Sequence, residues 1–347
     1  MKQHQWTTAL FLFAGCTVVP QGTAGKCESP AEPAGAQRVP IAAPQLDHHQ
    51  HLLNERARSV TVYDLRSLGL TSESREAERE PLVDADQLVQ MLDSAGILKA
   101  LVFSNAYYFA RSMTERPGEY EQVGAENDWT LAQVRRHPNR LYAACSVNPL
   151  RRYAAAEIER CVASGGFRAL KLHFDASSVD FGNPAHIASV RHAFATANRL
   201  RLPIVAHLAT RAGYGDREAR TFLNEIMPAA PSVPVTVNHL WGGGGYGRGP
   251  ADALAVFAEA FQRGDPRTGN LWFDLAQISM VASRDRDRAQ MVERMRQIGF
   301  TRLLYGSDGP EWSGVPPNQH WAEFSSCMPL TRDELNAIAV NIAPYLR

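Results

Sequence analysis

The sequence lacks an excess of charge of either sign. Its 347 residues include 36 Lys and Arg and 36 Asp and Glu, so its formal net charge is zero. Proteins that bind nucleic acid through its phosphates carry a basic surplus on at least one face. We therefore expect no nucleic acid as a partner and expect a small-molecule substrate. Nothing in the sequence decides between a monomer and a homodimer.

Cysteine is scarce, and its spacing matches no metal-binding or redox motif. Apart from Cys16 near the N-terminus, the cysteines are Cys27, Cys145, Cys161 and Cys327. This spacing excludes a zinc knuckle and a CxxC redox pair. Cys145 and Cys161 lie in apolar segments, which predicts buried, unreactive thiols.

The apolar run near the N-terminus, WTTALFLFAG, is too short to span a bilayer and resembles the hydrophobic part of a secretory signal. We expect residues 1–24 to form a signal peptide or a lipoprotein signal, in which Cys16 of the FAGC segment would be lipidated. Residues 25–44, rich in Pro, Gly and Ala, are predicted to be a flexible tether. The protein is then exported, and is either periplasmic or held at the membrane by the lipid alone. A disordered cytosolic tail is the alternative.

From about residue 98 onward, short apolar runs alternate with segments of helical periodicity. Together with one strand at LDHHQHL, the runs predict eight strands, the others being residues 97–104, 141–147, 167–174, 202–208, 233–240, 270–276 and 301–308. The alternation of strand and helix predicts a closed (β/α)8 TIM barrel over residues 45–347. No GxGxxG motif follows the first strand, which weakens the Rossmann-fold alternative.

Ionisable residues occur at the carboxyl ends of the predicted strands. In a (β/α)8 barrel these ends meet at one mouth, where active sites lie. The residues at these positions are His49, His51, Lys171, His173, His207, His239 and Asp308. Each alone has an ordinary structural explanation, such as a core histidine or a turn aspartate. Their recurrence at matching positions predicts a shared site.

The LDHHQHL segment places two histidines two residues apart. On an extended strand Asp47, His49 and His51 project to one side, while His48 and Gln50 project to the other. Two imidazoles on one face of a rigid strand can bind a single cation. Short histidine clusters also occur on protein surfaces, so this motif alone is a weak indication.

The ordered set DHHQH, KLH, VAH, NHLWGG and GSDGP resembles the amidohydrolase superfamily, within it the amidohydrolase-2 branch of metal-dependent TIM-barrel hydrolases and decarboxylases. The segment ENDWTLAQVRRHPNRLYAACSVNP also resembles this branch, so the likeness covers about residues 45–345. The resemblance implies one divalent metal ion, commonly zinc, held by His49, His51, His207 and Asp308. It also implies a catalytic histidine at His239.

Three imidazoles and a carboxylate suit Zn²⁺, with one position left for water. A bound water has its pKa lowered from ~15.7 toward ~7. Asp308 could then accept a proton from the water, while His239 polarises the substrate or protonates the leaving group. The expected reaction is hydrolysis of an amide, ester or lactone of a small carboxylated or cyclic substrate.

Two alternatives remain at the same site. The first is a metal-dependent, non-oxidative decarboxylase of an aromatic or unsaturated carboxylic acid. Export favours the hydrolase, because decarboxylases of this branch serve intracellular catabolism. The second alternative is a binding barrel without turnover.

Further side chains at the strand ends are candidates for binding the substrate. These are Lys171, His173, Trp241 and Trp312. Lys171 has a second interpretation, because a carboxylated lysine at this strand bridges two metals in other amidohydrolases. Two loop arginines, Arg111 and Arg248, are candidates for binding a substrate carboxylate.

Overall fold

The structure is a computed structural model that describes residues 41–347 except 68, 112–113, 211–212, 283 and 310–314. The predicted signal sequence, most of the predicted tether and Trp312 lie outside the described residues, so their predictions remain untested. Residues 41–44 have no regular secondary structure and lead directly into the first strand.

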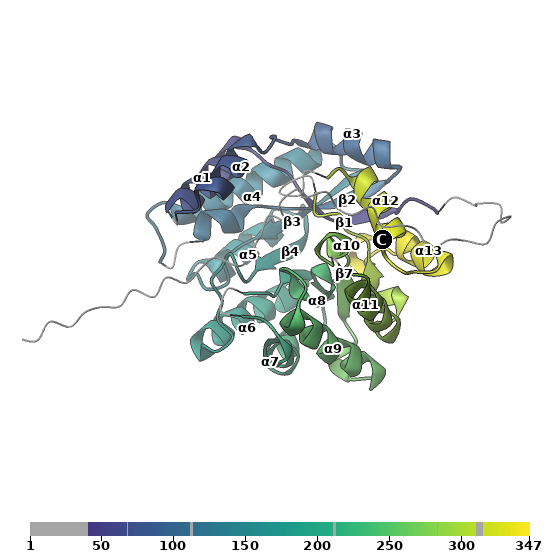
Figure 1. The fold of residues 1–347 in the computed structure, drawn as a ribbon. Helices are drawn as coiled ribbons and strands as arrows, with labels where there is room; N and C mark the ends of the chain where they lie inside the picture. The colour runs from purple at the N-terminus through teal and green to yellow at the C-terminus, as the bar shows by residue number, and fades with distance from the viewer. Residues whose placement is uncertain (1–40, 68, 112–113, 211–212, 283, 310–314) are drawn as a thin grey trace, which may run out of the picture.

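Eight parallel strands form a single sheet in the order β1 to β8. They are β1 (Leu46–His51), β2 (Lys99–Phe103), β3 (Leu141–Ser146), β4 (Phe167–His173), β5 (Ile204–His207), β6 (Val235–Val237), β7 (Leu271–Asp274) and β8 (Leu303–Leu304). Residues 305–309, which follow β8, return to β1: the N–H of His48 donates to the carbonyl of Tyr305, and Gln50 bridges Gly309. The predicted (β/α)8 barrel is confirmed (Figure 1).

Helices surround the strands (Figure 1). They are α1 (Glu55–Ser67), α2 (Thr71–Arg79), α3 (Ala85–Ala95), α4 (Glu119–Arg135), α5 (Ala154–Ala163), α6 (Pro184–Arg199), α7 (Asp216–Thr221), α8 (His239–Gly242), α9 (Arg248–Gln262), α10 (Ile278–Val281), α11 (Asp285–Ile298), α12 (Pro317–Cys327) and α13 (Arg332–Val340). Short 3-10 segments include η1 (Ala106–Ala110) and η6 (Pro344–Leu346). In the part of the chain that is described, no helix combines the length and apolar character needed to cross a membrane.

Local sequence signals explain several helix boundaries. Asp84 caps α3 by accepting the N–H of Gln87, whose side chain bonds back to Asp84, and Gly96 ends the helix in the left-handed conformation. Thr331 and Glu334 form the same reciprocal pair at the start of α13. The segment ADQLVQMLDSA is therefore bounded by an acidic cap at Asp84 and a glycine at Gly96.

The core has two layers, because strands of a parallel barrel are buried on both faces. The larger layer fills the space between strands and helices and contains Cys145 and Cys161, which are free and buried as predicted. The smaller one fills the barrel interior. There, Leu46 and Leu304 cluster with Ala343 and Leu346 from the C-terminal segment. The C-terminal segment thus packs near the start of β1. The candidate site lies at the opposite, carboxyl ends of the strands.

Candidate metal centre and active site

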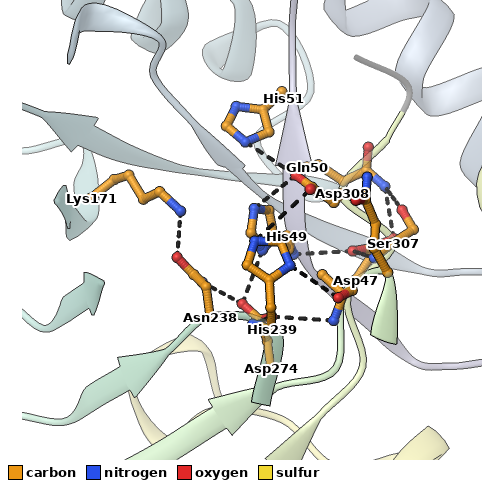
Figure 2. Close-up of polar contacts among 12 residues, drawn as sticks. Asp47, His49, Gln50, His51, Lys171, Asn238, His239, Asp274, Ser307 and Asp308 are labelled. Carbon is orange, nitrogen blue, oxygen red and sulfur yellow. Dashed lines mark hydrogen bonds and ion pairs between the residues drawn. The ribbon is translucent and has the colours of Figure 1, made fainter. Parts of the chain in front are cut away.

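Two histidines at the end of β1 face a carboxylate that follows β8. The Nε2 atom of His49 lies 2.9 Å from Oδ1 of Asp308, and the Nε2 atom of His51 lies 3.5 Å from the same oxygen (Figure 2). Asp308 lies 259 positions after His49 and 257 after His51 in the sequence. The three residues meet because the segment after β8 returns to β1. Sequence reasoning predicted this convergence.

His48 faces away from the site, as its parity predicts. Its Nδ1 donates to the carbonyl of Tyr305, and its Nε2 accepts the N–H of Ala343. The prediction that Asp47 and Gln50 project to opposite sides is wrong, because the Asp47 carboxylate accepts from the Gln50 side-chain amide at 2.7 Å. The physical reason is a register shift against β2 between Asp47 and Gln50, which breaks the simple alternation of the strand.

The Nδ1 atom of each central imidazole has a fixed acceptor. His49 donates to Oδ2 of Asp274 at 3.0 Å, and His51 donates to Oδ1 of Asn105 at 2.8 Å. His239 donates to a main-chain carbonyl, that of Ala276, at 3.0 Å. Neutral imidazole has one donor and one acceptor nitrogen, so with Nδ1 donating, Nε2 is the nitrogen whose lone pair can bind a cation.

Sequence reasoning missed Asp274 and Asn105. Asp274 ends β7 in the run NLWFDLA, so it had the same signal as Asp308: a carboxylate at the carboxyl end of an apolar strand. Asn105 lies two residues beyond β2, in a loop whose sequence gives no comparable signal.

The structure brings His239 into the same cluster. Its Nε2 lies 4.0 Å from Oδ2 of Asp308, and the candidate ligand atoms of His49, His239 and Asp308 all lie within 4.8 Å of one another. His207 is not one of these three residues, but its ring centre lies 5.1 Å from that of His239. The donor set fits a divalent cation. The assignments of His207 as a metal ligand and of His239 as the catalytic histidine stay predictions.

His207 is stacked on His173, with ring centres 4.0 Å apart and an angle of 14° between the planes. His173, which the sequence suggests as a substrate-binding candidate, therefore borders the cluster. Trp241 is buried in the core, and its indole N–H donates to the carbonyl of Gly243 at 2.9 Å. Substrate contacts for His173 and Trp241 stay predictions.

Backbone strain is concentrated at the ends of β6, β7 and β8. His239, Leu240, Gln277 and Asp308 have φ values of 53°, 62°, 56° and 60°, in the left-handed region that non-glycine residues rarely occupy. Such conformations cost about 1–3 kcal/mol each and persist where surrounding bonds fix them. The N–H of His239 donates to Asp274 at 2.8 Å, for example.

One glycine of the WGGGGYG run is required by the site. A Cβ atom on Gly243 would lie 2.1 Å from Cε1 of His207, and the φ of Gly243 is 109°. The glycine run therefore allows the backbone to approach closely, as its composition suggests. The group that it approaches is the His207 ring.

Lys171 is buried beside the cluster. Its Nζ donates to Oδ1 of Asn238, whose amide donates in turn to Asp274, the partner of His49 (Figure 2). Burial lowers the pKa of Lys171 to about 8, although the charges of Asp274 and Asp308 act in the opposite direction. The lysine is thus linked to His49 through Asn238 and Asp274.

Burial keeps most imidazoles of the site neutral. It lowers the pKa of His51 to about 3, against the attraction of Asp308. Burial also lowers the pKa of His207 and of His239, and the positive neighbours of His207 act in the same direction. Neutral imidazole is the form that binds metals.

His49 differs from the other histidines. Burial lowers its pKa, but the charges of Asp308 and Asp274 outweigh this effect and raise the pKa to about 9. Burial raises the pKa of Asp308, and the neighbouring His49 more than reverses this, so Asp308 is a carboxylate. The raised pKa of His49 and the lowered pKa of Asp308 favour an ion pair at the position that a cation would occupy.

Residues 46–341, which make up most of the chain, match the family described as amidohydrolase. The chain belongs to the amidohydrolase family. A comparison with curated proteins finds no match.

Several solved structures have the same amidohydrolase fold. The 5-carboxyvanillate decarboxylase of Sphingomonas paucimobilis is 13% identical, with a TM-score of 0.61, over 86% of this chain and 97% of that one. A dihydroxybenzoic acid decarboxylase from Polaromonas, solved with bound manganese, is 15% identical, with a TM-score of 0.55, over 86% and 95%. A probable 2-pyrone-4,6-dicarboxylic acid hydrolase from Acinetobacter baumannii is 14% identical, with a TM-score of 0.53, over 84% and 95%.

Proposed function

We propose that this amidohydrolase-family protein is a metal-dependent decarboxylase of a small aromatic or unsaturated carboxylic acid. The observation that carries the proposal is the convergence of His49, His51 and His239 on the carboxylate of Asp308. The fold shared with two aromatic-acid decarboxylases supports it. The sequence alone favours hydrolysis because of its predicted export signal, and the comparisons support decarboxylation better.

The proposal includes one divalent cation, zinc or manganese. His49, His51 and Asp308 would hold it, together with one of the two bordering imidazoles of His207 and His239. Nitrogen and carboxylate donors suit zinc, and manganese is bound in the Polaromonas decarboxylase. When bound, the cation supplies positive charge that orients a substrate carboxylate and stabilises developing negative charge.

The residues of the site supply the proton transfer. In decarboxylation the carbon that bears the carboxylate gains a proton, the carbon–carbon bond breaks, its electron pair returns to the substrate, and CO₂ leaves. Asp308 and His239 are placed to hold and move this proton, because Oδ2 of Asp308 lies 4.0 Å from Nε2 of His239. The bond from Nδ1 of His239 to Ala276 fixes the orientation of this ring.

Hydrolysis of an ester, amide or lactone is the second candidate function. The probable dicarboxylic acid hydrolase has the same fold. The same groups would serve, with Asp308 taking a proton from water and His239 giving one to the leaving group. The N-terminal segment that predicts export also favours this reaction.

Product analysis separates the two reactions. Purified protein loaded with Mn²⁺ or Zn²⁺ is incubated with hydroxylated benzoates and with carboxylated lactones, and release of CO₂ and of acid is measured. We expect CO₂ release, lost on chelation and restored by the metal. Asp308→Asn should lower kcat by at least about 100-fold, whereas Asp93→Asn, at an exposed position of α3, should not. Acid release without CO₂ would support hydrolysis instead, and no turnover of either class would contradict both.

A further inference from the structure

A charged side chain with a missing partner lies next to the site. Arg111 directly follows η1, the segment after β2. Its Nε atom is buried and has no hydrogen-bond partner among the described residues. Because a buried donor without an acceptor is unfavourable, such a group is commonly completed by a ligand.

Arg111 is held by aromatic packing. Its guanidinium carbon lies 4.8 Å from the centre of the Tyr108 ring. Tyr108 packs edge-on against Tyr107 at 4.6 Å, and both cluster with Ala176 from the loop after β4. A guanidinium stacked on an aromatic face keeps its planar fork of N–H groups available for a carboxylate.

Arg111 lies on the His173 side of the site. The ring of Tyr107, which packs against Tyr108, has its centre 4.9 Å from that of His173. His173 stacks on His207, which borders His239. Contacts between neighbouring aromatic and histidine rings therefore connect the candidate metal ligands with Arg111.

The second arginine suggested by the sequence has different surroundings. The side chain of Arg248, at the start of α9, is 97% exposed and pairs with Asp252 at 3.7 Å. Of these two arginines, only Arg111 has a buried donor without a partner. Arg248 is therefore a matched control.

We propose that Arg111 binds a second anionic group of the substrate, distinct from the group that reacts at the metal centre. The substrate is then a small dianion, such as a dicarboxylate, with one anionic group at the cation and the other at the guanidinium. This inference rests on the proposed function for the identity of the site. Its test measures binding and needs no turnover.

Binding of simple probes tests the proposal. Manganese-loaded protein is titrated calorimetrically with benzoate and with the three benzenedicarboxylates. We expect at least one dicarboxylate to bind roughly tenfold more tightly than benzoate, because a second charged hydrogen-bonded pair forms. Arg111→Met should remove this preference and leave benzoate binding unchanged. Arg248→Met should keep the preference, and Arg111→Lys should keep part of it.

Three results would overturn the proposal: no preference for a dicarboxylate in the wild type, an equal loss of all probes in Arg111→Met, or the same loss in Arg248→Met. Thermal melting of each variant shows whether it folds. If Arg111→Met does not fold, Arg111→Lys decides. An unchanged preference for the dicarboxylate in Arg111→Lys would contradict a bidentate contact from the Arg111 guanidinium. Absence of CO₂ release with an Arg111-dependent preference would reject decarboxylation and leave the anion site in place.

Discussion

At the scale of single residues, the orientation of His49 depends on a carboxylate outside the recognisable motif. Oδ2 of Asp274 accepts the Nδ1–H of His49, and Oδ1 accepts the main-chain N–H of His239. One carboxylate therefore fixes two imidazoles of the site. A carboxylate on the far nitrogen also increases the basicity of an imidazole ligand.

Replacing this carboxylate should weaken metal binding. In Asp274→Asn, one oxygen becomes an NH₂ group, which cannot accept a hydrogen bond. The single oxygen that remains cannot accept from both His49 and His239. We expect the affinity for Zn²⁺ or Mn²⁺ to fall by about 10–100-fold, the usual effect of losing such a partner. Competition with a chromogenic chelator measures it. Asp93→Asn is the control, and equal affinities in both variants would show that Asp274 does not position the ligands.

At the scale of elements, the turn after β6 approaches the ring at the end of β5. His239 and Leu240 have positive φ, and Gly243 follows with a φ of 109°. The Gly243 backbone passes so close to His207 that a side chain has no room. The turn therefore limits the position of the His207 ring by steric contact.

Gly243→Ala should disturb His207. The added Cβ would lie 2.1 Å from the His207 ring, and the backbone conformation would be strained. We expect a loss of roughly 1–3 kcal/mol in the free energy of unfolding, together with reduced metal content. Gly245→Ala is a matched control in the same run, because a Cβ there meets nothing within 4 Å. Denaturant unfolding and elemental analysis measure the two effects, and equal behaviour of both variants would contradict the steric role.

At the scale of the whole molecule, the barrel and the mouth of the site could be predicted because their signals are local. Most strands are short apolar runs, His51 and His207 end β1 and β5, and Asp308 follows β8 closely. The acceptors that fix the imidazoles are different. The bonds from His49 to Asp274 and from His51 to Asn105 join residues 225 and 54 positions apart in the sequence, and no local pattern specifies such pairs. The register shift in β1 likewise depends on pairing with β2.

Packing of α12 on the barrel gives the molecule a histidine that must stay neutral. His320 is buried, its Nε2 accepts the N–H of Gln277 at 3.2 Å, and its Nδ1 lies 3.1 Å from the hydroxyl of Tyr305. Protonation would place a second hydrogen against the Gln277 N–H. Burial lowers the pKa of His320 from 6.5 to about 4, although Asp308 acts in the opposite direction. Between these values the unfolded chain binds the proton more readily than the folded one.

This difference predicts how stability depends on pH. The contribution of His320 is fully present above pH 6.5 and is lost as the pH falls toward 4, by roughly 3 kcal/mol in all. His320→Gln keeps a polar side chain that does not titrate, so its unfolding free energy should decline less over this range than that of the wild type. Urea unfolding at several pH values measures the slopes. His192→Gln, on an exposed face of α6, is the control, and an unchanged slope in His320→Gln would mean that the packing of α12 does not require a neutral imidazole.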